Sequence, residues 1–370
     1  MKTERATKYR QVQDTLRDEI LSGRYRPGEK LPSEINLVKR FGTSRITIGR
    51  AIRELRDHEL IERRAGSGTY VRAIKSSGLV FGLLIPNLGD TEIFEPICGG
   101  MADASKGEQH VLLWGNASGA APSEEQALQL CQQYIDRRVS GVFFAPLEFT
   151  REDESVNRRI IDALEKARIP VVLLDRCYLP YPQRSRHDLV AIDNRRAGYL
   201  ITDHLLKLGC RRIAFIASAH SAPTVGARIA GYQEALSFYN VPNESRLVQI
   251  FDANDRQVLA KWLAREHPQA LVCANDRLAA NLMHSLLALG LSIPKDIRVV
   301  GIDDVGYASL LPVPLTTIHQ PCRAIGMAAM DTMISRLTRP GMPTRDVLLE
   351  VRLVVRESCG ATLPNESETL

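Results

Sequence analysis

The sequence has no apolar run long enough to cross a membrane. Its longest nearly apolar stretches, such as residues 79–85 and 141–147, have the length of one strand, whereas a membrane span needs about 18 residues. The first ten residues, MKTERATKYR, are polar, and no apolar segment follows them. This pattern predicts that there is no signal peptide, and we expect a cytoplasmic protein without membrane contact.

Paired cysteines and the motifs of common enzymes are also missing. The seven cysteines are odd in number and form no CxxC pair, which argues against a disulfide framework and against a zinc site. There is no Walker loop, no GxSxG, no HExxH, no GxGxxG and no lysine in a Schiff-base context. We therefore expect no enzymatic activity, no metal and no cofactor.

The charge of the chain is concentrated in its first part. Residues 1–75 carry 18 Lys and Arg against 10 Asp and Glu, whereas residues 76–370 carry 30 against 33. The first part is thus +8 and the remainder −3, which indicates a polyanionic partner for the first part only. The alternative interpretation is an ordinary solvated basic face, and the pattern of residues must decide between the two.

The basic first part has the pattern of a winged helix-turn-helix. Residues 9–21 are apolar at helical spacing, a second helix begins after Ser33, and a third begins near Ser44 after a short break that contains glycine. The runs 60–64 and 69–71 flank a glycine-rich turn, which predicts a hairpin or wing.

The start of the third helix is where such a domain would read a DNA sequence. Arginine is the commonest bidentate reader of guanine, and hydroxyls at a helix start suit phosphates. For Arg53 and Arg56, later in the helix, pairing with nearby acidic residues is the alternative role. The predicted DNA-contacting residues, wing included, are Ser33, Glu34, Thr43, Ser44, Arg45, Thr47, Arg50, Arg63, Arg64, Gly66, Ser67 and Gly68.

Residues 8–72 resemble the GntR-type winged-helix family nearly end to end. The stretches that carry the resemblance are PGEKLPSE (27–34), FGTSRIT (41–47) and GSGTYV (66–71). The resemblance implies DNA contacts by Ser33, Glu34, Ser44, Arg45, Thr47 and Gly66. Members of the family usually have arginine where this chain has Ile35 and Gly49, so we expect an operator that departs from the family norm.

Beyond a short polar linker at 73–78, strand-length apolar runs alternate with helical segments. This alternation predicts parallel sheets covered by helices, and about ten strands exceed one ordinary sheet, so we expect two lobes. The predicted helices are 123–138, 194–208, 225–239 and 275–289. The predicted strands are 79–85, 110–114, 141–146, 170–174, 189–192, 212–216, 246–250, 270–273, 298–302 and 347–355.

Polar residues follow several of these strands, where ligands bind in such folds. Carboxylates, amides and guanidinium groups can pair with ligand hydroxyls, although an isolated Asp at a strand end is more often a helix cap. We expect one or two of these residues to be caps only. These polar residues are Asp90 and the pairs Asp175-Arg176, Asp193-Asn194, Asn275-Asp276 and Asp303-Asp304.

Residues 79–358 resemble the LacI/GalR-type effector domain, which is related to periplasmic sugar-binding proteins. The stretches that carry this resemblance are DNRRAG (193–198), HLLKLG (204–209), RIAGY (228–232), ANDRLA (274–279), GIDD (301–304) and TTIHQP (316–321). The resemblance implies that Asp90, Phe94 and Arg176 of the first lobe and Arg228, Asn275, Asp276 and Asp303 of the second lobe face an effector. Gln320 would lie at a crossover between the lobes. Phe94, Trp114, Tyr178 and His220 compete for a stacking role, with Trp114 expected in the core.

We therefore expect an α/β protein of two parts. Residues 1–72 form the winged helix-turn-helix domain and 79–360 form a two-lobed, periplasmic-binding-protein-like domain, followed by a tail at 361–370. Its first lobe would comprise about 79–190 and 319–338, and its second lobe 191–318 and 339–360.

The function that these parts predict is transcriptional regulation, with repression as the expected sign. A homodimer would bind double-stranded operator DNA under control of a sugar-like effector. The open alternatives are a non-sugar effector, a ligand-independent DNA binder, or an enzyme of the aminotransferase-like kind to which GntR-type heads are also fused.

Overall fold

The computed structural model describes residues 8–21, 24–25, 28–57, 60–64, 67–71, 78–85, 92–105, 110–115, 123–148, 151–219 and 221–361. The chain divides into two compact units, residues 1–77 and 78–370. The boundary falls inside the predicted linker, of which residues 73–77 lie outside the described part. None of the helices in the described ranges combines the length and the apolar character that crossing a bilayer demands.

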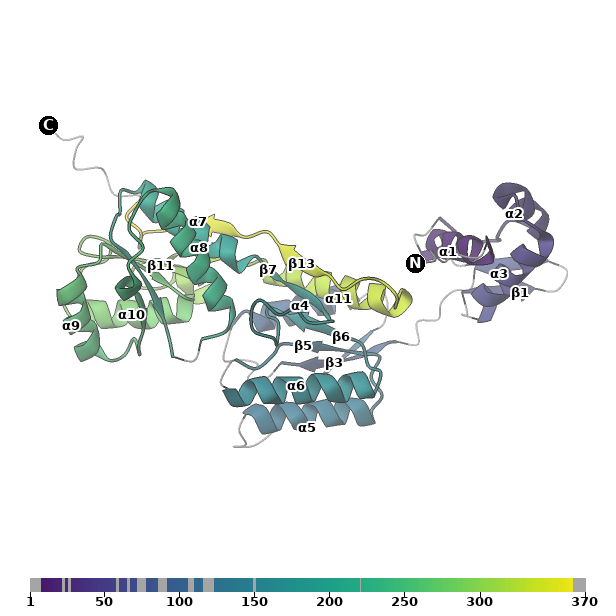
Figure 1. Ribbon diagram of the computed structural model, residues 1–370, viewed down its shortest axis with the longest axis horizontal. Helices are drawn as coiled ribbons and strands as arrows, with labels where there is room; N and C mark the ends of the chain where they lie inside the picture. Colours follow the sequence, from purple (N-terminus) through teal and green to yellow (C-terminus); the bar gives the residue numbers. More distant parts are fainter. Residues whose placement is uncertain are drawn as a thin grey trace. The chain divides into compact units, whose positions relative to one another are not determined.

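The first unit contains the three helices and the hairpin that the sequence predicts. Ser33 caps the second helix by accepting a hydrogen bond from the Asn36 N–H, and Ser44 does the same for the third from the Thr47 N–H. The core is apolar and includes the fully buried Leu16, Leu37, Ile48 and Leu55. The elements are α1 (Lys8–Leu21), α2 (Glu34–Phe41), α3 (Arg45–Asp57), β1 (Ile61–Arg64) and β2 (Gly68–Val71), with β1 and β2 antiparallel (Figure 1).

The second unit contains two six-stranded sheets, each with helices packed against it. The first sheet has the strand order β13-β7-β6-β5-β3-β4, and all its neighbouring strands are parallel. Its strands are β3 (Val80–Leu84), β4 (Val111–Trp114), β5 (Gly141–Phe144), β6 (Val171–Leu174), β7 (Asp188–Ile192) and β13 (Asp346–Leu349). The helices of this first lobe are α4 (Phe94–Ser105), α5 (Ser123–Asp136), α6 (Arg151–Lys166) and α11 (Cys322–Thr338).

The second sheet has the order β14-β12-β11-β10-β8-β9, parallel except for the antiparallel pair β12–β14. Its strands are β8 (Ile213–Ala217), β9 (Val248–Ile250), β10 (Ala270–Cys273), β11 (Arg298–Asp303), β12 (Thr316–His319) and β14 (Arg352–Val354). The helices of this second lobe are α7 (Asn194–Lys207), α8 (Thr224–Phe238), α9 (Arg256–Glu266) and α10 (Asp276–Ala288), with short 3-10 turns at Ser245–Leu247 and Gly306–Ser309.

The structure differs from the sequence prediction at two segments, residues 347–355 and β12. The segment 347–355, predicted as one strand, is divided into β13, which pairs with β7 of the first sheet, and β14, which pairs with β12 of the second. The predicted placement of all of 339–360 in the second lobe is therefore wrong for β13. The strand β12 was not among the predicted strands. Periodicity identifies extended segments, but it carries no information about which sheet accepts them.

The chain passes between the lobes three times, after β7, after β12 and between β13 and β14. Three separate connections restrict how one lobe can move relative to the other. They also bring the carboxyl ends of strands from both sheets toward the same region.

Candidate functional site

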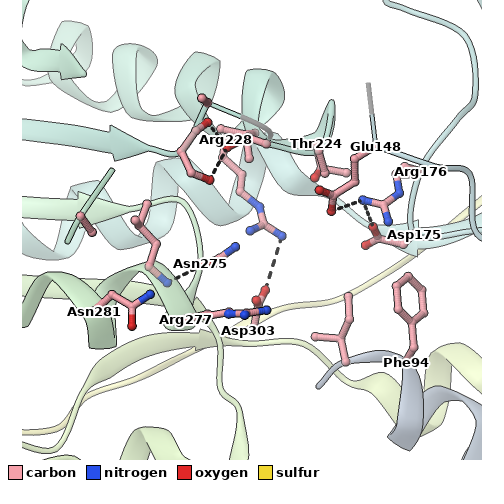
Figure 2. A pocket seen from close by; sticks show the side chains of 18 of the residues that line it. Phe94, Glu148, Asp175, Arg176, Thr224, Arg228, Asn275, Arg277, Asn281 and Asp303 are labelled. Atoms are coloured by element: carbon pink, nitrogen blue, oxygen red, sulfur yellow. Dashed lines mark hydrogen bonds and ion pairs between the residues drawn. The ribbon is translucent and has the colours of Figure 1, made fainter. Parts of the chain in front are cut away.

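A cavity of about 460 Å³ lies at the carboxyl ends of strands from both sheets (Figure 2). This is where parallel α/β folds bind ligands, because the loops that follow the strands converge there. The first lobe contributes Ile93, Phe94, Glu148, Asp175 and Arg176. The second lobe contributes Ser218, Ala219, Ser221, Ala222, Thr224, Val225, Arg228, Asp252, Ala253, Asn275, Arg277, Leu278, Asn281 and Asp303.

Arg228 is a buried cation of the cavity and has three polar partners. Its side chain is buried, its Nε donates to Asn194 Oδ1 at 2.8 Å, and its Nη1 donates to the carbonyl of Ala274. Its Nη2 lies 3.5 Å from Asp303 Oδ1 (Figure 2). These contacts fix the planar guanidinium group, so that it can offer hydrogen bonds to a ligand without first being ordered.

The close packing of α7 against α8 places Arg228 in this position. A Cβ atom added to Gly198 of α7 would stand 2.0 Å from the carbonyl oxygen of Arg228, and one added to Gly231 of α8 would stand 1.9 Å from that of Arg195. Only glycine permits this approach of the two helix backbones.

Asp303 is the anionic partner of Arg228 and has an unusual backbone. It ends β11 at a φ of 133°, a region that residues other than glycine rarely adopt. Gln320 Nε2 donates to its Oδ1 at 2.6 Å. Burial raises the pKa of Asp303 to about 7, although the positive charge of Arg228 acts in the opposite direction. Arg228 and Gln320 thus both contact the Oδ1 atom of Asp303.

Replacing Asp303 by asparagine is expected to change how stability depends on pH. The pKa of the carboxyl rises from an ordinary 3.8 to about 7 on folding, so ionising it disfavours the folded state as the pH increases from about 4 to about 7. Asparagine does not ionise. The free energy of unfolding of Asp303→Asn minus that of the wild type should therefore increase across this pH range, by on the order of 3 kcal/mol. Urea unfolding at several pH values measures the difference. Parallel profiles for the two proteins would contradict this assignment.

In the first lobe, Arg176 and Phe94 line the opposite side of the cavity. Arg176 donates through Nε to the Pro146 carbonyl at 2.9 Å and through Nη1 to Glu148 Oε1 at 3.3 Å. Its Nη1 also lies 3.8 Å from Asp175 Oδ2, and its guanidinium carbon lies 5.9 Å from the centre of the Phe94 ring. This side therefore combines an ordered cation with an aromatic face.

Two neighbouring residues at the start of α10 have different roles. Asn275 caps the helix by accepting from the Leu278 N–H at 2.8 Å, and it also lines the cavity. Asp276, predicted to face the effector, does not line the cavity. Its oxygens accept from the Thr317 hydroxyl at 2.6 Å and from the Val305 N–H at 3.1 Å, in fully buried surroundings, and burial raises its pKa to about 6. Asp276 thus fixes the loop that follows Asp303.

Gln320 also lies outside the wall of this cavity and acts through its hydrogen bond to Asp303. Asp193 is a helix cap, since its carboxylate accepts from the Arg196 N–H at 2.9 Å. Trp114, expected in the core, is 54% exposed at the end of β4. Tyr178 is buried beside His187 and does not line the cavity. Asp90 and His220 lie outside the described residues.

Several lining residues were missed by the sequence analysis. The polar residues after β5, β8 and β9, namely Glu148, Ser218, Ser221 and Asp252, obey the same strand-end rule that identified the others. Asn281 lies within α10 and carries no such signal, so only the three-dimensional arrangement reveals it. Within the described ranges, no group of three or more His, Cys, Asp or Glu residues could hold a metal ion.

The predicted DNA-contacting residues gather at the start of α3, the start of α2 and the hairpin. Arg45 is the most prominent, with a side chain 78% exposed and its Nε 3.4 Å from Glu34 Oε2. Ser44 is exposed, and its hydroxyl contacts that of Thr47 at 2.8 Å. Ile46, which the sequence analysis did not single out, is 86% exposed beside Arg45. An exposed apolar side chain at this position can contact a thymine methyl group.

The other predicted DNA-contacting residues lie on or near α3, near the start of α2 and in the hairpin. Arg50 is exposed and stacks on the Tyr9 ring at 4.0 Å, and Arg64 pairs with Glu62 at 2.8 Å while stacking on Tyr70. Arg63 and Glu34 line a groove between α3 and the hairpin. Gly68 has a φ of 132° in the turn, where Ser67 bonds the Tyr70 hydroxyl, and Thr43 is half-buried. Gly66 lies outside the described residues.

A basic winged-helix unit joined to a two-lobed domain with a polar interlobe cavity defines the class of DNA-binding transcriptional regulators that respond to small molecules. Comparison with known families gives the same result for this chain. Residues 8–71 match the gntR family of bacterial regulatory proteins, and residues 202–359 match the periplasmic binding protein-like domain. The chain therefore joins a domain that matches the gntR family of bacterial regulatory proteins to a domain that matches periplasmic binding protein-like domains.

Several curated proteins and solved structures that are similar to this chain are named as transcriptional repressors or regulators. The arabinose metabolism transcriptional repressor of Geobacillus stearothermophilus is 28% identical over 97% of this chain and 99% of its own length. The ribose operon repressor of Escherichia coli K12 is 29% identical over 64% of this chain and 69% of its own. A LacI family transcriptional regulator from Enterococcus faecium with bound ribose superimposes with a TM-score of 0.62 at 25% identity, covering 75% and 98% of the two chains.

Proposed function

We propose that this protein is a repressor whose binding to operator DNA is controlled by a neutral sugar in the interlobe cavity. The single observation that supports this most is the cavity itself, which is lined by polar side chains from both lobes around the ordered Arg228. Its volume of about 460 Å³ lies within the range that small-molecule sites usually have.

The charges in the cavity favour a neutral ligand over an anionic one. The cavity wall has four acidic side chains (Glu148, Asp175, Asp252 and Asp303) and three arginines (Arg176, Arg228 and Arg277). Arg228 and Arg176 already have acidic partners, so the cavity offers no excess of positive charge to an anion. Guanidinium and carboxylate groups held in this way can exchange pairs of hydrogen bonds with vicinal hydroxyls. The Phe94 ring adds an apolar surface suited to the C–H face of a sugar ring. The names of the arabinose and ribose repressors and the ribose-bound neighbour agree with this class of ligand.

Control of DNA binding follows from the connections between the lobes. A ligand that contacts both sides of the cavity stabilises the arrangement of lobes that it fits best, by at most the difference in its affinity for the two arrangements, typically 1–3 kcal/mol. In a homodimer, this change alters the spacing of two DNA-binding heads, which must match half-sites one or more helical turns apart. We propose that the protein acts in the cytoplasm and without a catalytic step, since the similar proteins are named as transcriptional regulators.

A thermal-shift screen against pentoses, hexoses, sugar acids and sugar phosphates tests the proposed ligand class. A native-state ligand at 100 times its dissociation constant adds about 2.7 kcal/mol to the free energy of unfolding, which a melting curve detects readily. We expect a selective shift with one neutral sugar. A shift with sugar phosphates or sugar acids alone would contradict the neutral-ligand proposal, and no shift with any of them at millimolar concentration would contradict a sugar effector altogether.

A further inference from the structure

The amino edge of the first-lobe sheet carries a concentration of arginine that the effector cavity does not use. The loops 137–140, 167–170, 183–187 and 339–345 lead into β5, β6, β7 and β13, which are parallel and therefore begin at the same edge. Together these loops contain seven arginines and no Asp or Glu, although residues 76–370 as a whole are net negative. Six of the seven are exposed, and they define the arginine face: Arg137, Arg138, Arg168, Arg184, Arg186 and Arg339.

Most of this charge is not neutralised within the chain. Arg184 pairs with Asp346 at 3.0 Å, whereas the other five have no ion-pair partner in the part of the chain that the structure describes. The corresponding edge of the second lobe differs, because its Arg212 pairs with Glu244 at 3.2 Å and with Glu266 at 2.9 Å. The free positive charge is thus a property of the first lobe.

Two of these arginines occupy backbone positions that disfavour them. Arg138 and Arg168 follow α5 and α6 with φ values of 51° and 58°, in the left-handed region that usually ends a helix with glycine or asparagine. At the equivalent positions of the second lobe, after α9 and α10, His267 has a φ of 43° and Gly290 a φ of 81°. A left-handed residue other than glycine costs about 1–2 kcal/mol, which the attraction of a cation to a helix C-terminus only partly offsets.

The arginine face surrounds a rigid recess. A cavity of about 380 Å³ is lined by Arg168 and Arg186 together with Pro170, Pro340, Asp188 and Arg336. Asp188 is buried, and Arg336 binds both its oxygens at 2.9 Å, so this pair forms a neutral, ordered floor. The exposed guanidinium groups of Arg168 and Arg186 therefore remain available to an anion outside the protein.

The arginine face lies at the edge where the chain from the DNA-binding unit enters the first lobe. The Val80 N–H donates to Ser140 Oγ at 3.2 Å, and the Ser140 N–H donates to the Val80 carbonyl at 2.7 Å, which places the start of β3 next to the loop of Arg137 and Arg138. Six residues separate Val71 from Gly78 in the sequence, so the two Cα atoms can be at most about 25 Å apart. The short linker limits how far the two units can separate, so the same DNA molecule can reach both.

We propose that the arginine face binds the phosphate backbone of DNA beside the sequence that the winged helix reads. The inference rests on the DNA-binding function of the first unit. That unit is itself +8, so charge repulsion disfavours its docking on the arginine face, whereas DNA attracts both. These contacts carry no sequence information, but they add affinity and couple the first lobe directly to the DNA.

Salt-dependent binding of a random 40-base-pair duplex by the full-length protein tests this proposal. The variant Arg168→Gln/Arg186→Gln removes two free cations, and glutamine at position 168 is no more strained than arginine. The matched control Lys261→Gln/Lys295→Gln removes two exposed cations from the second lobe. Each lost phosphate contact lowers the magnitude of the slope of log K against log salt by about 0.9. For the arginine variant we expect a slope lower by about 1.8 for each subunit that contacts the duplex and a roughly tenfold weaker affinity at low salt, with the control unchanged.

Equal slopes and equal affinities for the arginine variant, the lysine control and the wild type would overturn the proposal. A failure of the DNA-binding function looks different, because the wild type would then not bind the duplex at all. Unchanged melting temperatures verify folding. If the first variant does not fold, Arg137→Gln/Arg339→Gln replaces it, with the same expected loss.

Discussion

Replacing Arg45 by alanine is expected to weaken operator binding by about 1–3 kcal/mol per head, or roughly 5- to 150-fold. Arg45 lies at the start of α3 with its side chain 78% exposed, and within the described part of the chain its side chain has one ion pair, a long contact of 3.4 Å to Glu34. The change therefore costs little stability but removes the group best placed for bidentate contact with guanine. Fluorescence anisotropy with a duplex selected by the full-length protein measures the loss.

The variant Lys39→Ala is the matched control for Arg45→Ala. Lys39 is an exposed cation on α2 of the same unit, so its removal changes the net charge equally. We expect the control to weaken the selected duplex and a random duplex to the same small extent. Equal losses for Arg45→Ala on both duplexes would show that Arg45 binds phosphate and does not read sequence.

Replacing Arg228 by alanine is expected to abolish effector binding and to lower the free energy of unfolding by about 3–5 kcal/mol. The substitution removes the hydrogen bonds to Asn194 and to the Ala274 carbonyl, and it leaves the buried Asp303 carboxylate without its cation. Urea unfolding measures the stability, and calorimetric titration with the sugar found by thermal shift measures the affinity, at a temperature where the variant is folded.

Two further variants separate the loss of the site from the loss of the fold. Arg228→Lys keeps a charge near Asp303 but not the planar fork, so it should recover part of the stability and little of the affinity. Arg195→Ala removes an arginine from the facing helix, where its side chain is 63% exposed and paired with Glu234, and should cost at most about 1 kcal/mol. Unaltered sugar affinity in Arg228→Ala would show that the effector binds elsewhere.

The sequence predicted the positions of helices and strands better than it predicted which strands pair in each sheet. Helices and strands with strong periodicity, such as α5, α7, α8 and α10, were found within one or two residues. The segment 347–355 was not, because its apolar pattern suits either sheet and the change of lobe at Glu350 and Val351 leaves no trace in periodicity.

The sequence identified cavity-lining residues correctly where a polar side chain lies at the end of a buried strand. Asp303 and Arg176 follow buried strands directly and do line the cavity. Asn275 and Asp276 are adjacent at a helix start, and their side chains diverge into the cavity and into the core, which spacing alone does not reveal. Trp114 was expected inside because of its size, but it ends the edge strand β4, where only one side is covered.

The two departures from the GntR-type pattern have a structural counterpart. Ile35 is 61% exposed, and a Cβ added to Gly49 would meet nothing within 4 Å. Position 35 is therefore exposed surface, whereas Gly49 is half-buried in a groove that Arg53, Arg56 and Arg63 also line. The expectation that the operator departs from the family norm stays a prediction.

The central claim is that one sugar, bound between the lobes, changes the affinity of this protein for its operator. The most direct measurement is the dissociation constant of the full-length protein for its selected duplex, with and without the sugar found by thermal shift. We predict weaker binding with the sugar, by roughly 5- to 150-fold for a coupling of 1–3 kcal/mol, and no change in Arg228→Ala. An identical dissociation constant in the presence of saturating sugar would contradict the account.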